Sequence, residues 1–181
     1  MIDCLEVCDA HAITLEHLKN HLRIEGAFED YYLEGLIKTA TSAVENYLQR
    51  TLLLKTLRVV HQDRTSASRG CSALQTIDLY YPPLVSIVSV NELLSNDGKG
   101  PIKRYTLTPS SLRPKMTVWG SVVEVVYKAG YGENSSNIPS PIRYAITLLT
   151  AEMYDKRVDV VEIVNPTIQF LLQPYRVMSC V

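Results

Sequence analysis

Apolar residues between positions 29 and 50 recur at intervals of three and four, the spacing of one face of an α-helix. This stripe consists of Leu33, Leu36, Ile37, Ala40, Val44, Tyr47 and Leu48. A shorter stripe, formed by Leu15, Leu18 and Leu22, follows Thr14, a residue type favoured at helix N-caps, and Gly26 ends that segment. The pattern predicts two N-terminal helices within residues 1–52.

After Arg50 the pattern changes to an alternation of apolar and polar residues, which is typical of β-strands. The segments that show it are residues 56–61, 76–81, 86–94, 104–108 and 118–128. Pro82-Pro83 ends one strand because proline cannot donate a ladder hydrogen bond, and Asn96-Asp97-Gly98 is a strong turn signal. Residues 65–72 are rich in serine, arginine and glycine, which is typical of a loop. We expect an inserted β-rich lobe of five or six short strands over residues 53–128.

Helical spacing returns in the final third of the chain. Ser140 is expected to cap a helix that begins at Pro141, and its apolar stripe is formed by Ile142, Ala145, Ile146, Leu149 and Met153. Asn165-Pro166 breaks the chain before a short helix over residues 167–172, and Pro174 begins a tail. The order of elements predicts an α+β fold in a single domain. Its helical core would be formed by residues 1–52 and 129–181, interrupted by the lobe.

The net charge of −1 conceals an uneven distribution of charge. Residues 1–49 hold 3 Lys and Arg against 9 Asp and Glu, a net of −6, whereas residues 50–115 hold 10 against 4, a net of +6. The acidic part can neutralise the basic part within one molecule, or the two can pair between neighbouring copies in a ring. The sequence does not choose between these arrangements.

Few residues form a pattern that indicates catalysis or metal binding. Cys4, Cys8, Cys71 and Cys180 are scattered, which favours reduced thiols. His17 and His21 lie four apart on a predicted helix and could hold a metal, but Leu18 takes the place of the glutamate in the zinc-protease motif and no third ligand is near. A solvated helix face is favoured, and we expect no catalytic group, cofactor or metal.

The sequence also lacks signals for membranes and secretion. No apolar run approaches the roughly 20 residues that cross a bilayer. The acidic residues Asp3, Glu6 and Asp9 do not fit the start of a secretory signal. We expect the protein to act in the compartment where it is made.

A group of basic residues surrounds the predicted turn of the β-rich lobe. It consists of Lys99, Lys103, Arg104, Arg113 and Lys115. The group is either a solvated rim of a hairpin or a surface that contacts DNA phosphates, an acidic partner or a neighbouring subunit. No helix-turn-helix, zinc-finger or RNA-binding motif accompanies it, so sequence-specific readout is not expected.

Five segments in this order resemble the gp6-like head–tail connector (adaptor) proteins of tailed bacteriophages. The most specific segment runs from Tyr127 to Gly132 (YKAGYG) and continues in residues 139–146 (PSPIRYAI). The others are residues 13–24, the helix that closes on Arg50-Thr51-Leu52, the proline-bounded strand pair at residues 77–90, and residues 171–176. Glu152-Met153 and Asp155-Lys156 depart from the residues common in the family, and we expect these differences to alter helix packing.

The resemblance implies a structural virion protein and no enzyme. Such proteins form a homo-oligomeric ring, twelve-fold in the virion, below the portal protein at the head–tail junction. The ring extends the channel through which double-stranded DNA passes without sequence-specific readout, and it receives the next neck or tail-completion protein. The resemblance places portal docking in residues 165–181, here Pro174, Tyr175 and Arg176, and assembly in the cytoplasm of the host bacterium.

Two alternatives remain open at this point. One is a DNA-contacting accessory of genome packaging that uses the basic group of the lobe, and the other is a small enzyme whose site no motif reveals. The proline break and the tail-like ending also predict that truncation after Pro166 leaves a folded protein that no longer docks on the portal.

Overall fold

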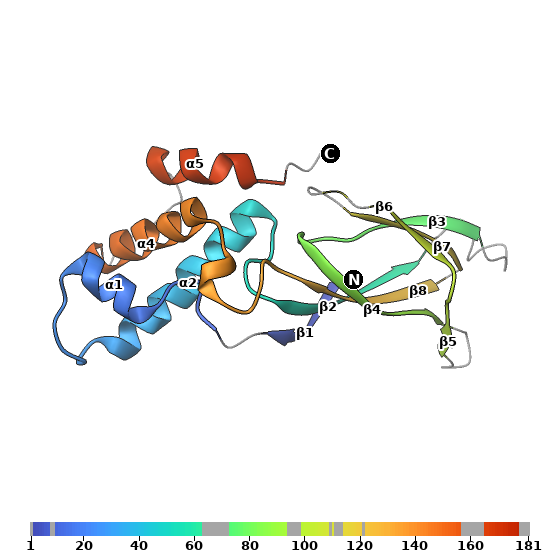
Figure 1. The fold of residues 1–181 in the computed structure, drawn as a ribbon, viewed down its shortest axis with the longest axis horizontal. Helices are drawn as coiled ribbons and strands as arrows, with labels where there is room; N and C mark the ends of the chain where they lie inside the picture. Colours follow the sequence, from blue (N-terminus) through green and yellow to red (C-terminus); the bar gives the residue numbers. More distant parts are fainter. Residues whose placement is uncertain are drawn as a thin grey trace. The chain divides into compact units, whose positions relative to one another are not determined.

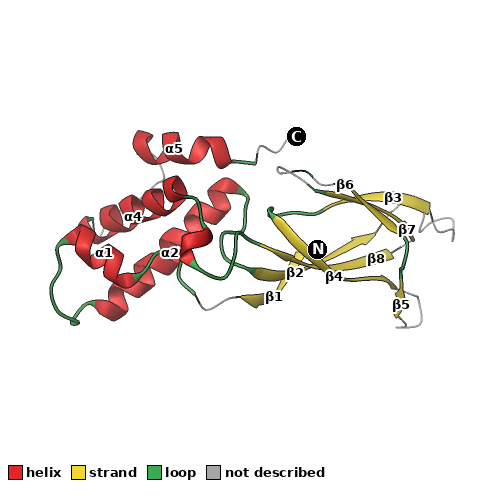
Figure 2. Ribbon diagram, viewed as in Figure 1, coloured by secondary structure: helices red, strands yellow, loops and turns green. Residues whose placement is uncertain are grey.

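The computed structural model describes residues 2–7, 10–62, 73–93, 99–108, 110, 114–120, 122–156 and 165–177. The chain divides into two compact units. The sheet unit consists of Met1–Cys8 and Leu54–Gly130, and the helical unit of Asp9–Leu53 and Tyr131–Val181. Figure 2 shows the strands in the first and the helices in the second. The predicted α+β fold is confirmed.

The described part of the sheet unit contains two antiparallel sheets, whose strands are labelled in Figure 1. The five-stranded sheet has the order β1 (Ile2–Val7), β2 (Lys55–Gln62), β8 (Val122–Ala129), β4 (Leu84–Leu93) and β5 (Lys99–Pro101). The three-stranded sheet has the order β3 (Ala73–Asp78), β7 (Lys115–Gly120) and β6 (Tyr105–Thr108). Central strand β8 pairs with β2 along its whole length, from Lys55 opposite Ala129 to Gln62 opposite Val122.

The two sheets share one hydrophobic core. The alternation of side chains along each strand places every second residue on the inner face. Inner residues from both sheets form a single cluster of Leu57, Val59, Ile77, Leu79, Val90, Met116, Val118, Val123, Val125, Tyr127 and Ala129. The hydroxyl of buried Tyr127 donates a hydrogen bond of 2.7 Å to the carbonyl oxygen of Tyr80, which satisfies its polar end.

Five features of the chain differ from the prediction or lie outside the described residues. Strand β1 was not predicted, because an edge strand of six residues carries little periodic signal. Residues 118–128 were predicted as one strand, but the chain divides there between β7 and β8, which belong to different sheets. Strand β3 ends at Asp78 rather than at position 81, where Tyr81 has a φ of +59° that a strand does not allow. The predicted turn at residues 96–98 and the loop at 65–72 lie outside the described residues.

The helical unit contains α1 (Leu15–Leu22), α2 (Asp30–Leu48), α4 (Ser140–Asp155) and α5 (Pro166–Leu172). Two short 3₁₀ turns cover Ser135–Asn137 and Gln173–Tyr175. No described helix is both long and apolar enough to span a bilayer.

The helix starts follow ordinary capping chemistry with one correction. Thr14 accepts a hydrogen bond of 3.2 Å from the backbone N–H of His17, and Asn165 accepts one of 3.0 Å from Thr167. Ser140, predicted as a cap, is the first residue of α4; Pro139 holds the N-cap position and makes no side-chain cap bond.

The predicted apolar stripes form the core of the helical unit. The buried face of α2 consists of Leu33, Ile37, Ala40, Val44 and Leu48, and that of α4 includes Ile142, Ala145, Ile146 and Leu149. The short helix α5 contributes Ile168 and Leu172, both fully buried in the same cluster. Helix α5 is therefore part of the core, so truncation after Pro166 would remove two fully buried side chains, which argues against the expectation that the truncated chain stays folded.

Candidate interaction surfaces

The C-terminal segment is held against the end of α2. The Nε atom of Arg50 donates a hydrogen bond of 2.5 Å to the carbonyl oxygen of Tyr175, and the N–H of Val177 donates one of 3.0 Å to the carbonyl of Leu48. The second bond satisfies one of the helix-end carbonyls that lack an intrahelical partner. The residues that precede Val177 are thus fixed by the helical unit and do not form a free tail.

Two aromatic rings complete this attachment. The guanidinium of Arg176 lies 4.7 Å from the centre of the Tyr47 ring, within the range of a cation–π interaction. Arg50 is only 8% exposed and lies beside Tyr131. Burial raises the pKa of the Tyr131 hydroxyl, and the positive charge of Arg50 opposes that rise. The arrangement leaves Pro174 and Arg176 exposed, and Tyr175 is half-buried.

The basic residues of the lobe do not form one uniform patch. The ammonium group of Lys99 donates hydrogen bonds of 2.8 and 3.1 Å to the two carboxylate oxygens of Glu124. Lys115 lies 3.7 Å from a carboxylate oxygen of Asp78. Lys103 and Arg104 are exposed and have no ion pair with another described residue. Arg113 lies outside the described residues.

Glu124 is the centre of a charge network on the five-stranded sheet. Its carboxylate is 2% exposed and accepts hydrogen bonds from Arg58 Nε at 2.6 Å and from Asn91 at 3.3 Å, in addition to those from Lys99. Burial raises the pKa of this carboxyl, but the hydrogen bonds from Lys99, Asn91 and Arg58 and the charge of Arg58 outweigh burial, so the pKa is lowered. Arg58 also approaches Asp3 at 3.8 Å, which extends the network to the edge strand.

The two candidate metal ligands, His17 and His21, have different surroundings. The ring of His21 packs edge-on against Tyr144 at 6.5 Å between ring centres, and His17 lines a cavity described next. Cys4 is exposed, and the other three cysteines lie outside the described residues. Within the described ranges no group of three or more histidine, cysteine or acidic residues is placed to hold a metal.

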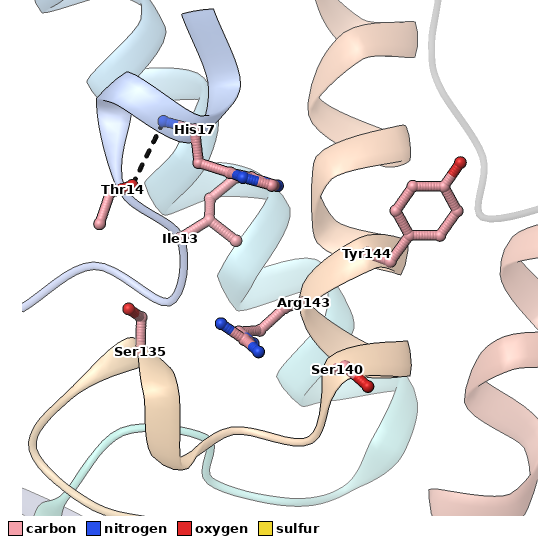
Figure 3. A pocket seen from close by; sticks show the side chains of 7 residues that line it. All are labelled: Ile13, Thr14, His17, Ser135, Ser140, Arg143 and Tyr144. Carbon is pink, nitrogen blue, oxygen red and sulfur yellow. Dashed lines mark hydrogen bonds between the residues drawn. The ribbon is translucent and has the colours of Figure 1, made fainter. Parts of the chain in front are cut away.

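A cavity of about 350 Å³ in the helical unit was not predicted from the sequence. Figure 3 shows it between α1, the 3₁₀ turn at Ser135–Asn137 and the start of α4. Its lining consists of Ile13, Thr14, His17, Ser135, Ser140, Arg143 and Tyr144. Arg143 was noted only as part of a family motif, because its place in a cavity depends on three segments far apart in the sequence.

One protein family matches part of the chain. The family model of phage gp6-like head–tail connector proteins matches residues 12–76, a little over a third of the chain. The resemblance to the gp6-like connectors is confirmed. This family is one of structural proteins, in agreement with the predicted class. No curated protein matches the chain.

The fold of the whole chain is similar to that of chains in gene transfer agent particles. A chain in the virion of a native gene transfer agent (GTA) particle has a TM-score of 0.80 at 20% identity. Chains in the neck of an empty GTA particle, computed with C6 symmetry, and in the neck of a native GTA particle, computed with C12 symmetry, have TM-scores of 0.83 and 0.79 at 19% identity. Each similarity covers 100% of this chain and 97% of the other, so the fold is shared from end to end.

Proposed function

We propose that this chain is a head–tail connector that forms a ring in the neck of a phage-like virion. The observation that carries the proposal is the agreement of its fold, over its entire length, with chains from GTA necks. The connector-family match over residues 12–76 supports the same conclusion from sequence. The ring would be made in the host cytoplasm and would lie below the portal.

The rotational symmetry of the similar structures supports a closed ring. The GTA necks were computed with C6 and C12 symmetry, and rotational symmetry closes identical chains into a ring through heterologous contacts. We infer a twelve-fold ring that extends the DNA channel and receives the next neck or tail-completion protein. A net charge of −1 per subunit suits a channel wall along which DNA slides, because such a wall must not bind phosphates tightly.

Mass measurement during size-exclusion chromatography tests the assembly. The purified chain is run alone, with the portal protein of the same particle, and with an unrelated ring protein as a control. We expect a complex of portal and connector in which the connector is present in multiple copies. A strict monomer that does not bind the portal would refute the proposal.

The C-terminal segment is the proposed portal contact. Pro174 and Arg176 are exposed while the backbone around them is fixed by Arg50 and by Leu48, so the segment presents a preformed surface. We expect Arg176→Glu to weaken portal binding about tenfold or more, the size of one lost charge-assisted contact. The matched control is Lys38→Glu, a charge reversal on an exposed residue of α2. Equal binding by both variants would remove the segment from the interface.

A second function, direct DNA contact through the lobe, is favoured by one observation: Lys103 and Arg104 are exposed and lack ion pairs with the described residues. Binding to duplex DNA is measured as a function of salt for the natural chain and for Lys103→Glu with Arg104→Glu. Loss of affinity and a shallower salt dependence in the double variant would support this function. Unchanged binding would exclude these two residues from DNA contact.

A further inference from the structure

The cavity of the helical unit contains an arginine, Arg143, that has no ion pair with any carboxylate of the described residues. Arg143 extends its guanidinium from α4 toward Ser135, and the ring of His17 points into the same space from α1 (Figure 3). The Nε atom of Arg143 is inaccessible to solvent and has no hydrogen-bond partner among the described residues.

A buried N–H of a charged group without a partner is unfavourable, so this site has unused capacity to donate. Thr14 is already engaged, because its hydroxyl accepts the capping bond of α1. The hydroxyls of Ser135 and Ser140 make no hydrogen bond with the described residues and add further donors to the lining. The donors around the cavity therefore favour an oxyanion.

The net charge of the helical unit and the size of the cavity favour a single carboxylate over a polyanion. The helical unit holds 8 Lys and Arg against 12 Asp and Glu, a net charge of −4, which repels a polyanion such as duplex DNA. A cavity of about 350 Å³ with one arginine admits a single side chain or chain end, whereas the backbone of a rigid duplex cannot enter it. A planar guanidinium pairs with a carboxylate through two parallel hydrogen bonds.

We propose that this cavity binds a carboxylate group presented by a protein partner, as an aspartate or glutamate side chain or as a chain end, and that Arg143 is the residue that pairs with it. The inference rests on the proposed function only in requiring a protein partner. Binding of a small carboxylate by the isolated chain does not depend on ring assembly, so the two proposals can fail separately.

Nuclear magnetic resonance of the full chain with ¹⁵N-labelled arginine and backbone tests the site. Acetate is titrated against the uncharged acetamide, which has nearly the same shape, while the Arg143 Nε–H and the backbone amides of Ser135 and His17 are followed. We expect acetate, and not acetamide, to shift these signals saturably with a Kd of about 1–10 mM, an affinity that two charge-assisted hydrogen bonds can support. Equal shifts with both probes, or none with acetate, would overturn the proposal.

Two substitutions assign the effect to the guanidinium. Arg143→Gln removes the charge and should weaken acetate binding at least about tenfold at the Ser135 amide, while Arg143→Lys should retain part of it. Retained binding in Arg143→Gln would overturn the proposal. Inorganic phosphate is titrated in parallel, and a phosphate response that duplex DNA competes away would reassign the cavity to nucleic acid and overturn it also.

The source of the carboxylate is identified by assembly of the Arg143→Gln variant. Loss of self-association would indicate a carboxylate from a neighbouring copy. Loss of portal binding with self-association intact would indicate a carboxylate of the portal. An Arg143→Gln variant with normal self-association and normal portal binding would overturn the role of a protein partner.

Discussion

Glu124→Gln is the sharpest test of what holds the sheet unit together. The substitution keeps the shape of a side chain that is 2% exposed but removes the negative charge that Arg58, Asn91 and Lys99 surround. The two cations remain; Lys99 loses its carboxylate partner, and Arg58 keeps only the approach to Asp3 at 3.8 Å. Glu124 lies on central strand β8, and its partners come from β2, β4 and β5. Removal of its charge therefore weakens contacts between four strands.

The magnitude follows from the exposure of the partners. A hydrogen bond to a charged group contributes about 1.5–3 kcal/mol. Three such bonds, one from Arg58 and two from Lys99, lose their charged acceptor. The side chains of Arg58 and Lys99 are 33% and 55% exposed, so water screens both pairs and the cations can turn toward solvent. We therefore expect the free energy of unfolding to fall by about 2–3 kcal/mol, which corresponds to a decrease of about 5–10 °C in Tm for a chain of this size.

Urea denaturation at several pH values measures the effect and its cause. The folded-state pKa of Glu124 lies below its reference value of 4.5, so its contribution is fully present above about pH 4.5 and is lost as the pH falls through the lower folded value. The difference between the natural chain and Glu124→Gln should therefore shrink as the pH decreases below 4.5. Lys103→Met, at an exposed residue of the same unit, is the control and should change stability by less than about 0.5 kcal/mol. A difference that is constant down to pH 3, or a control with an equal loss, would refute the reasoning.

Three further predictions concern packing in the helical unit. Leu172→Ala removes a fully buried side chain and should lower the free energy of unfolding, measured in urea, by about 2–5 kcal/mol. The control Phe170→Ala, at a side chain 76% exposed, should change it by less than about 0.5 kcal/mol. Equal losses in the two variants would contradict the core position of α5. Gly35→Ala should stabilise α2 by about 0.5–1 kcal/mol in thermal unfolding, because the added methyl group meets no atom within 4 Å. Gly132→Ala should destabilise by more than about 1 kcal/mol in the same assay, because its Cβ would lie 2.0 Å from Asn137 Nδ2; a rise in Tm would contradict this placement.

The helical unit was largely predictable because its signals are local. A stripe with helical spacing identifies both the helix and its buried face, and five of the seven stripe residues predicted for α2 are fully buried. The sheet unit was less predictable, since strand pairing depends on contacts distant in sequence. Strand β1 pairs with β2, whose paired residues lie 48 to 57 positions further along the chain, and nothing within residues 2–7 alone indicates that partner.

The interaction surfaces could be predicted only in part for the same reason. Lys99 was identified as a member of a basic group, but its carboxylate partner is 25 positions away on another strand. Glu124 itself is one polar residue in an apolar strand, and its burial depends on Arg58 from 66 positions away. The tail-like composition after Pro174 was visible, whereas its attachment to Arg50 bridges 125 positions.

The charge asymmetry is smaller between the two folded units than between the two segments counted along the sequence. Counted along the sequence, the acidic and basic parts are residues 1–49 and 50–115. Counted by unit, the helical unit carries −4, and the sheet unit, with 10 Lys and Arg against 7 Asp and Glu, carries +3. Part of the positive charge of the sheet unit is neutralised internally by Glu124 and Asp78, whereas Lys103, Arg104 and Lys128 have no ion pair with the described residues. An acidic helical unit and a basic sheet unit that neutralises part of its own charge are better suited to selective protein contacts than to general phosphate binding.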